Sequence, residues 1–212
     1  MTLPNPLSEA GYSSATSGQS PLLLPSAGRA APLDILVRVQ CFTNCEEAEL
    51  TLNGRSLGTR RLPDAPERIL YWDVPYEAGA LTVEGRNQGR IAAQTSLQTS
   101  GTAKKLAAQA DTAALQANGI DVAPLSVMVV DENDVPVFGA AHEITWTVRG
   151  PAHLLGLESG DHSSHEDYQA NRRKAFGGRL LGYIQATETA GTVTIDLTAP
   201  GLEGASLVLE CR

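Results

Sequence analysis

The sequence predicts an all-β protein. Its 212 residues include 20 glycines and 12 prolines, which interrupt short runs of Val, Leu and Ile, as in proteins built from strands joined by tight turns. Along these runs apolar and polar residues alternate, which is the period of a strand with one buried face. Hydrophobic residues make up 42% of the chain and charged residues 19%, a balance that supports a buried core rather than disorder. We therefore expect antiparallel sheets packed as sandwiches.

The first 33 residues differ from the rest in composition. Ser, Gly and Pro dominate them, and they offer little apolar surface to offset the entropy cost of ordering. Leu22 to Leu24 form an apolar run that is too short for a signal peptide, and no basic region precedes it. Residues 1–33 are therefore expected to be a flexible linker or the result of a cut inside a longer chain.

Residues 34–100 predict a small antiparallel β-sandwich. Asn53-Gly54 stands between two apolar runs and is a strong hairpin signal, because both residues tolerate the positive φ of a type I′ turn. A second hairpin is expected at residues 87–89, and Pro75 should close a strand because it cannot donate to a central ladder. Five strand-forming runs are expected: residues 35–41, 48–62, 68–74, 80–86 and 90–98.

Residues 101–212 predict a second sandwich, joined to the first by a linker at residues 99–103. Trp146 lies in the middle of an expected strand with Ile144 on the same face, as a core Trp between two sheets would. About seven strands over roughly 110 residues fit an immunoglobulin-like sandwich. Residues 106–118 are Ala-rich, which leaves a short helix open as the alternative to the expected strand, turn and strand. The predicted fold is thus two tandem immunoglobulin-like antiparallel β-sandwiches preceded by a flexible N-terminal segment.

Charge and cysteine content narrow the classes of function. The net charge is −8, and without a basic stripe neither a nucleic acid nor a membrane surface is an expected partner. No run of the sequence nears the about 20 apolar residues of a membrane-spanning helix. The odd set of Cys41, Cys45 and Cys211 does not describe a disulfide framework. A Cys41–Cys45 bridge would need an intervening turn, so small buried thiols are the favoured interpretation, and no cofactor is expected.

The most concentrated polar stretch spans residues 159–176, and we expect it to be a long loop. Its carboxylates and imidazoles leave a zinc or calcium site open, although the spacing of the two histidines matches no standard zinc signature. The favoured interpretation is a loop held by its own hydrogen bonds, with Asp161 capping the backbone and Arg172 or Arg173 pairing with a nearby carboxylate. Loops of this length often carry function. The residues expected to contact another domain or a sugar are Asp161, His162, His165, Glu166 and Tyr168.

Two parts of the sequence resemble parts of one enzyme family. NCEEAELTLNGRSLG (residues 44–58), followed by WDVPYEAGALTVEG (72–85), is similar to the β-sandwich domain that follows the catalytic barrel in bacterial members of glycoside hydrolase family 2, typically β-galactosidases. The second half, from DVAPLSVMVVDENDVPV to AGTVTIDLTAPGL (121–202), resembles the immunoglobulin-like domain that comes next in those enzymes. The sequence departs from the family pattern at Asn133-Asp134 and at His162.

The resemblance implies a non-catalytic role. Enzymes of this family carry their catalytic carboxylates in a (β/α) barrel upstream of such domains, and a barrel alone needs about 250 residues. The chain would then be the non-catalytic C-terminal region of a parent glycosidase, and the catalytic domains would be the partner on which it packs. A carbohydrate-binding module and an immunoglobulin-like adhesion module remain as alternatives. An exposed aromatic platform would favour the carbohydrate-binding module, and a large apolar patch would favour packing.

No catalytic residue is expected among the carboxylates. A retaining glycosidase needs two carboxyl groups about 5 Å apart in a cleft. Glu46-Glu47, Asp131-Glu132 and Glu166-Asp167 are neighbours in sequence, so on a strand the partners point to opposite faces. Trp72 could stack on a sugar ring, but a place in the core of the first sandwich is the favoured interpretation.

Overall fold

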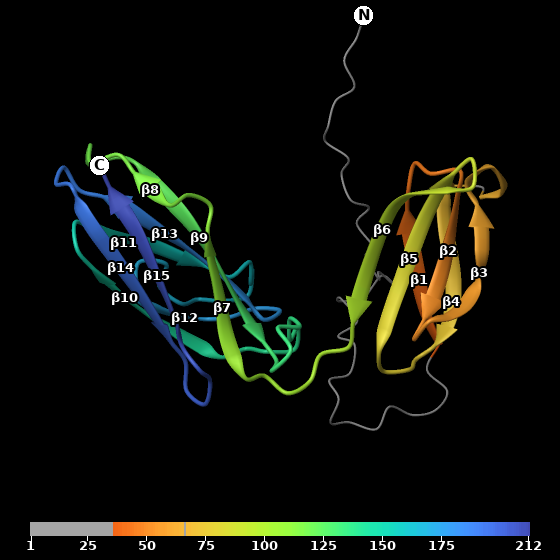
Figure 1. Cartoon of the computed structure of the whole chain (residues 1–212). Helices are drawn as coiled ribbons and strands as arrows, with labels where there is room; N and C mark the ends of the chain where they lie inside the picture. The colour runs from red at the N-terminus through yellow and green to blue at the C-terminus, as the bar shows by residue number, and fades with distance from the viewer. Residues whose placement is uncertain (1–35, 66) are drawn as a thin grey trace, which may run out of the picture. The chain divides into compact units, whose positions relative to one another are not determined.

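The computed structural model describes residues 36–65 and 67–212, and Figure 1 shows strands throughout this part of the chain. The predicted all-β class is confirmed, because the described residues form β-sheets and one short 3₁₀ turn, Leu62–Asp64. They divide into two compact units, the second of which starts at Ser100. The segment 1–33, predicted to be flexible, lies outside the described residues. The part of the chain that the structure describes contains no helix with the length and hydrophobicity of a membrane span.

The first unit is a sandwich of a two-stranded and a four-stranded sheet, both antiparallel. The strand orders are β1 (Leu36–Phe42) beside β4 (Ile69–Pro75), and β3 (Arg55–Arg61), β2 (Glu47–Leu52), β5 (Ala80–Asn87) and β6 (Arg90–Gln98). Alternation along the strands turns apolar side chains inward, so that Leu50 is 0% and Trp72 3% exposed. The indole Nε1 of Trp72 donates to the carbonyl of Gly58 at 3.1 Å. Trp72 is therefore a core residue, as expected, and its ring face is not open to a sugar.

Two tight hairpins set the register of the larger sheet. Asn53 and Gly54 have φ values of 51° and 76°, as in a type I′ turn, and they join β2 to β3 as predicted. Gln88 and Gly89, with φ values of 50° and 74°, join β5 to β6 in the same way. The run 48–62 is therefore two strands joined by the predicted hairpin, and the described part of the unit has six strands, one more than the five expected.

The second unit is a sandwich of a four-stranded and a five-stranded sheet. The first has the order β11 (Ala152–Glu158), β13 (Arg179–Ala186), β9 (Val122–Val130) and β7 (Lys105–Ala110). The second has the order β12 (Arg172–Lys174), β10 (Glu143–Arg149), β14 (Gly191–Thr198), β15 (Ala205–Cys211) and β8 (Ala114–Leu115). Neighbouring strands are antiparallel except β15 and β8, which are parallel. Strand β12 lies inside the stretch that the sequence predicted to be a loop.

The Ala-rich start of the second unit is strand, turn and strand. β7 pairs with β9 from Lys105, opposite Val130, to Ala110, opposite Leu125. This pairing buries Leu106, which is 5% exposed, against the core. The helix that the sequence left open at residues 106–118 is therefore wrong, because pairing with β9 satisfies the backbone groups that a helix would have bonded internally.

Trp146 fills the space between the two sheets of the second unit. It is 1% exposed, and Ile144 on the same face of β10 is 0% exposed, which confirms the predicted core position. The indole ring reaches the opposite sheet at Gly182 of β13, where a Cβ atom would clash with three carbons of its six-membered ring. The backbone of β13 thus lies directly against the indole, and only glycine leaves room for it.

The three cysteines are buried free thiols. The Cys41–Cys45 bridge, which the sequence left open as the less favoured interpretation, is not formed. Burial raises the pKa of Cys41, and the neighbouring Cys45 raises it further. Burial also raises the pKa of Cys211. Cys41 and Cys211 are therefore held in their protonated, less reactive form.

Candidate functional site

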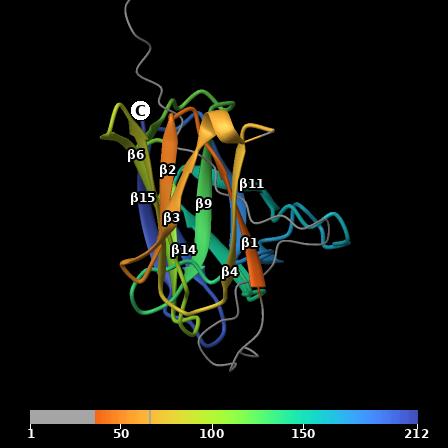
Figure 2. The same cartoon turned by 90° about the vertical axis from the view of Figure 1, so that its right-hand side faces the viewer.

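The polar loop of residues 159–171 connects β11 to β12. In Figure 2 it extends sideways from the strands. Asp161 Oδ1 accepts from the backbone N–H of Ser163 at 2.9 Å and from its hydroxyl at 2.7 Å. Asp167 Oδ1 accepts from the backbone N–H of Gln169 at 2.9 Å. Both aspartates therefore hold turns of the loop itself, as the sequence predicts for Asp161.

The carboxylate of Asp161 is held in its charged form. Its pKa is lowered first by the hydrogen bond from the Ser163 hydroxyl and then by the backbone N–H of the same residue. A carboxylate that accepts two local hydrogen bonds is a poor general acid, because the proton that it would have to carry is disfavoured. Asp161 is therefore suited to shaping the loop or to accepting hydrogen bonds from a partner.

Glu166 ties the loop to the edge strand β12. Its Oε1 accepts from the backbone N–H of Lys174 at 3.2 Å, and its Oε2 accepts from the Ser164 hydroxyl at 3.0 Å. The two oxygens are thus engaged with neighbours on either side of the loop. This side chain therefore links the loop to the backbone of β12.

Arg173 lies beneath the loop and is fully buried. Its Nη1 donates to the carbonyl of Glu166 at 3.1 Å, and its Nε donates to the hydroxyl of Ser159 at 3.4 Å. Its guanidinium carbon lies 4.3 Å from the centroid of the Tyr168 ring. The sequence predicted an arginine paired with a carboxylate, but Arg173 binds a carbonyl and an aromatic ring instead. The reason is that alternation along β12 turns Arg173 inward, away from the exposed carboxylate of Asp167.

The two histidines of the loop stand apart from this network. His162 and His165 are exposed, and neither makes a hydrogen bond within the described residues. The described part of the chain brings no three His, Cys, Asp or Glu side chains close enough to share a metal ion. The loop thus gathers Asp161, Glu166 and Tyr168 into one framework and leaves the imidazoles to solvent or to a partner.

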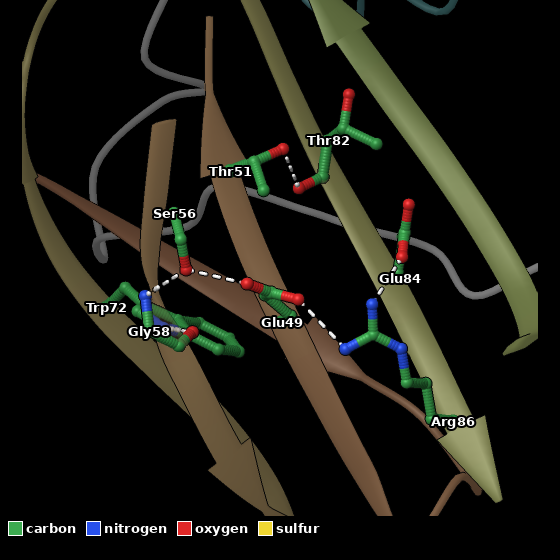
Figure 3. Close-up of polar contacts among 8 residues, drawn as sticks. All are labelled: Glu49, Thr51, Ser56, Gly58, Trp72, Thr82, Glu84 and Arg86. Carbon is green, nitrogen blue, oxygen red and sulfur yellow. Dashed lines mark hydrogen bonds and ion pairs between the residues drawn. The ribbon is translucent and has the colours of Figure 1, made fainter. Parts of the chain in front are cut away.

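A second polar cluster lies on the outer face of the larger sheet of the first unit (Figure 3). Glu49 of β2 and Glu84 of β5 are directly opposite each other in the strand register. Arg86 donates to both carboxylates, at 2.8 Å to Glu49 and at 2.7 Å to Glu84. Ser56 of β3 donates to the remaining oxygen of Glu49 at 2.6 Å. Three strands therefore meet at one carboxylate.

The sequence pattern did not indicate that Glu49 and Glu84 are neighbours, because only the strand register brings residues so distant in the chain together. The pKa of Glu49 is lowered, first by the Ser56 hydroxyl and then by Arg86. Glu49 in turn raises the pKa of Arg86. Glycoside hydrolysis needs one carboxyl group protonated as a general acid, and these neighbours favour the opposite form of Glu49. The cluster is typical of a cross-strand ladder of ion pairs on a solvated sheet face.

An apolar hollow in the first unit is too small for a sugar. It is lined by Val37 and Val39 of β1, Leu81 of β5 and Leu97 of β6, among others, and has a volume of about 50 Å³. Sites for small molecules usually have volumes of about 300 Å³ or more. Its apolar lining also offers few groups to bind sugar hydroxyls.

Comparison with known families finds matches in both units. Residues 106–208 match the family described as glycoside hydrolase family 2 C-terminal domain 5. Residues 35–93 match a domain of unknown function, DUF4982. Together the two matches account for most of both sandwiches.

Several curated glycosidases are similar to this chain. The β-galactosidase BoGH2A of Bacteroides ovatus is 31% identical over 173 residues, which are 81% of this chain and 20% of that enzyme. A β-galactosidase of Thermoanaerobacter pseudethanolicus is 28% identical, over 73% of this chain and 21% of that enzyme. The chain thus spans about a fifth of the length of the curated relatives that it matches.

Solved structures give the same match. A β-glycosidase from Bacteroides vulgatus superimposes with a TM-score of 0.82 at 26% identity, over 88% of this chain and 24% of that one. A family 2 glycosyl hydrolase from Bacteroides cellulosilyticus superimposes with a TM-score of 0.78 at 26% identity, over 84% of this chain and 23% of that one. In both cases the similarity is confined to about a quarter of the larger protein.

Proposed function

Because its second unit matches the C-terminal domain 5 of glycoside hydrolase family 2, we propose that this chain is the non-catalytic C-terminal region of a β-galactosidase-like enzyme, which packs on and positions the catalytic domains. The observation that carries the proposal is the match of residues 106–208 to glycoside hydrolase family 2 C-terminal domain 5. It is supported by the length of the relatives, about four-fifths of which lie outside the similarity.

The two polar clusters favour a structural role over a catalytic one. In the first unit Arg86 and Ser56 hold Glu49 ionised on a solvated sheet face. In the second unit Asp161 and Glu166 are engaged in holding their own loop. A glycosidase barrel of about 250 residues would not fit in this chain, and the lowered pKa values of Glu49 and Asp161 make these two carboxyl groups unsuited to be the protonated general acid that the reaction needs.

A second candidate function is contact with a sugar that the parent enzyme already holds. The observation that favours it is the exposed part of the loop, where His162, His165 and the half-exposed Tyr168 offer donors, acceptors and one ring. Such a set would be too weak to capture a sugar from water, because each hydrogen bond replaces one to solvent. It could orient a sugar bound elsewhere.

The proposal is tested by enzyme assay of the purified chain. Nitrophenyl β-galactoside and β-glucuronide should not be hydrolysed between pH 4 and 8, and titration with galactose or lactose should show no saturation below millimolar concentration. Hydrolysis that follows the protein through purification and disappears in Glu49→Gln or Glu166→Gln would contradict the non-catalytic role. The reading frame upstream of Met1 should encode a (β/α) barrel, and a parent gene without one would remove the proposed partner.

A further inference from the structure

We propose that three exposed aromatic side chains of the second unit, the aromatic strip of Phe138, Tyr168 and Phe176, form the surface that packs on the catalytic part of the parent enzyme. This inference rests on the proposed function and adds the residues that carry it. The exposed fractions of the three side chains are 40%, 51% and 51%. The other aromatic residues of this unit are Trp146, which is buried, and Tyr183, which is half-buried. The unit therefore presents most of its aromatic residues to the outside.

The two phenylalanines are carried by backbone segments that touch. Phe138 lies in the loop before β10, and Phe176 lies in the turn between β12 and β13. The N–H of Gly178 in that turn donates to the carbonyl of Ala140 at 2.9 Å. A Cβ atom on Gly178 would clash with the carbonyl of Val137. The contact is thus close enough to require glycine, and it fixes the two loops against each other.

The third ring, that of Tyr168, contacts the same edge strand, β12. Tyr168 stacks on Arg173 of β12, and Phe176 lies two residues beyond Lys174, the last residue of that strand. The backbone carbonyl of Tyr168 also accepts from the N–H of Leu157 in β11 at 2.7 Å. The three rings therefore stand on connected parts of one framework.

Arginines hold two of the rings in place. The guanidinium carbon of Arg179 lies 5.5 Å from the centroid of the Phe138 ring, and that of Arg173 lies 4.3 Å from the Tyr168 centroid. Each stack is a cation–π contact that restricts the ring before any partner arrives. A ring that is already ordered loses little entropy on binding, so its burial contributes more fully to affinity.

The segment that carries Phe176 is basic, although the chain as a whole is acidic. Residues 172–179 (RRKAFGGR) contain four basic and no acidic residues, whereas the net charge of the chain is −8. Arg172, Lys174 and Arg179 in this segment are exposed. Aromatic and arginine side chains are the residues enriched where protein interfaces gain most of their affinity. The partner that fits is a protein surface with apolar pockets for the rings and carboxylates around them.

The catalytic part of the parent enzyme meets this description better than a sugar does. About four-fifths of each curated relative lies outside the region that this chain matches, so those enzymes contain a large protein surface beyond this region. A sugar needs an open ring face and hydrogen bonds to its hydroxyls. Phe138 and Tyr168 each have an arginine stacked on the ring, and the two phenylalanines offer no hydrogen bond.

The test measures binding between the 212-residue chain and the catalytic region of its parent, produced as a separate polypeptide. Phe138→Ser with Phe176→Ser, and separately Tyr168→Ala, should each weaken the Kd at least about tenfold, as expected for central interface aromatics. The control is Ile120→Ser with Val208→Ser, which removes two side chains that are 75% and 58% exposed and lie outside the strip. The control should leave the Kd unchanged, and thermal unfolding of each variant shows whether the second unit remains folded at the temperature of the binding measurement.

The outcomes separate the two proposals. If the unaltered chain does not bind the catalytic region, the proposed function and this inference both fail. If it binds and the strip variants bind equally well, only the assignment of the surface is wrong. Titrating galactose, lactose and glucuronate into the same proteins tests whether the aromatic strip binds a sugar instead. Sugar binding that the strip variants lose, with an unchanged Kd for the catalytic region, would make the strip a sugar platform and overturn the inference.

Discussion

At the scale of single residues, the second unit depends on one buried carboxylate. Asp131 is 2% exposed. It accepts backbone N–H bonds from Gly101 at 2.6 Å and from Asn133 and Val135 at 2.9 Å each. Burial would raise the pKa of Asp131, but the three N–H bonds and the nearby Lys105 outweigh that effect and lower it. One side chain thus fastens the start of the second unit to the turn that follows β9.

Replacing Asp131 by Asn should lower the free energy of unfolding of the second unit by about 2 kcal/mol near neutral pH, because a hydrogen bond to a charged group contributes about 1.5–3 kcal/mol. The folded-state pKa lies below the unfolded value of about 3.9. The carboxylate therefore stabilises the fold above the unfolded pKa, and this stabilisation is lost as the pH falls through the folded-state pKa. Urea unfolding between pH 3 and 7 should show the full difference from wild type above about pH 5 and a shrinking one below about pH 4.

The control for Asp131→Asn is the exposed Asp111, which is replaced by Asn in the same way. This variant removes the same charge without the three backbone hydrogen bonds, and it should unfold within about 0.5 kcal/mol of wild type. If the difference between wild type and the Asp131 variant were independent of pH, the proposed ionisation of Asp131 would be wrong.

At the scale of secondary-structure elements, the hairpins were predictable and the short edge strand was not. Asn53-Gly54 specifies its turn locally, so the pairing of β2 with β3 follows from the sequence alone. β12 has only three residues, and it forms because β10 offers an edge to pair with. Its charged sequence Arg172–Lys174 carries no apolar alternation that would have indicated a strand.

Part of the candidate site could be predicted from the sequence, and part of it could not. The turn held by Asp161 follows from local sequence, because an aspartate accepts hydrogen bonds from residues just ahead of it. The burial of Arg173 and the meeting of Glu49 with Glu84 depend on pairing between strands that are distant in the chain. Such contacts require the register of the folded sheet, which hydrophobic alternation alone does not specify at the level of individual side chains.

The packing of β10 on β13 gives a direct test at this scale. Gly182→Ala should destabilise the second unit by about 1–3 kcal/mol, because the added methyl group overlaps the rigid ring of Trp146 and forces the strands apart. Trp146→Phe in the same chain should recover part of that loss, because the smaller ring leaves room for the methyl group. A double-mutant cycle of urea unfolding energies measures this coupling. Additive effects of the two substitutions would show that they do not touch.

At the scale of the whole molecule, the linker belongs partly to each unit. The N–H of Thr99 donates to the carbonyl of Gly79 in the first unit at 2.9 Å. The N–H of Lys104 donates to the carbonyl of Val130 in the second unit at 2.8 Å. Between them, Gly101 is held by Asp131. The predicted boundary at about residue 101 therefore falls in a short segment whose two ends are hydrogen-bonded to different sandwiches.

Limited proteolysis should cut the chain slowly near Gly101 and leave two folded fragments, because each unit has its own core. Asp131→Ala should accelerate this cut severalfold, since it frees the N–H of Gly101 and loosens the segment. Mass spectrometry of the fragments locates the cut, and circular dichroism shows whether each fragment remains folded. A single resistant fragment that spans residues 36–212 in both proteins would show that the linker is not an accessible hinge.

The contact between Trp146 and Gly182 also constrains how homologous sequences can diverge. A lineage that gains any side chain at position 182 loses the space that the indole occupies, so it must replace the tryptophan first or acquire both changes together. Substitutions at the two positions should therefore be correlated across related domains, with glycine retained wherever tryptophan is present. An alignment of homologues in which the two positions vary independently would show that those sandwiches have a different spacing between their sheets.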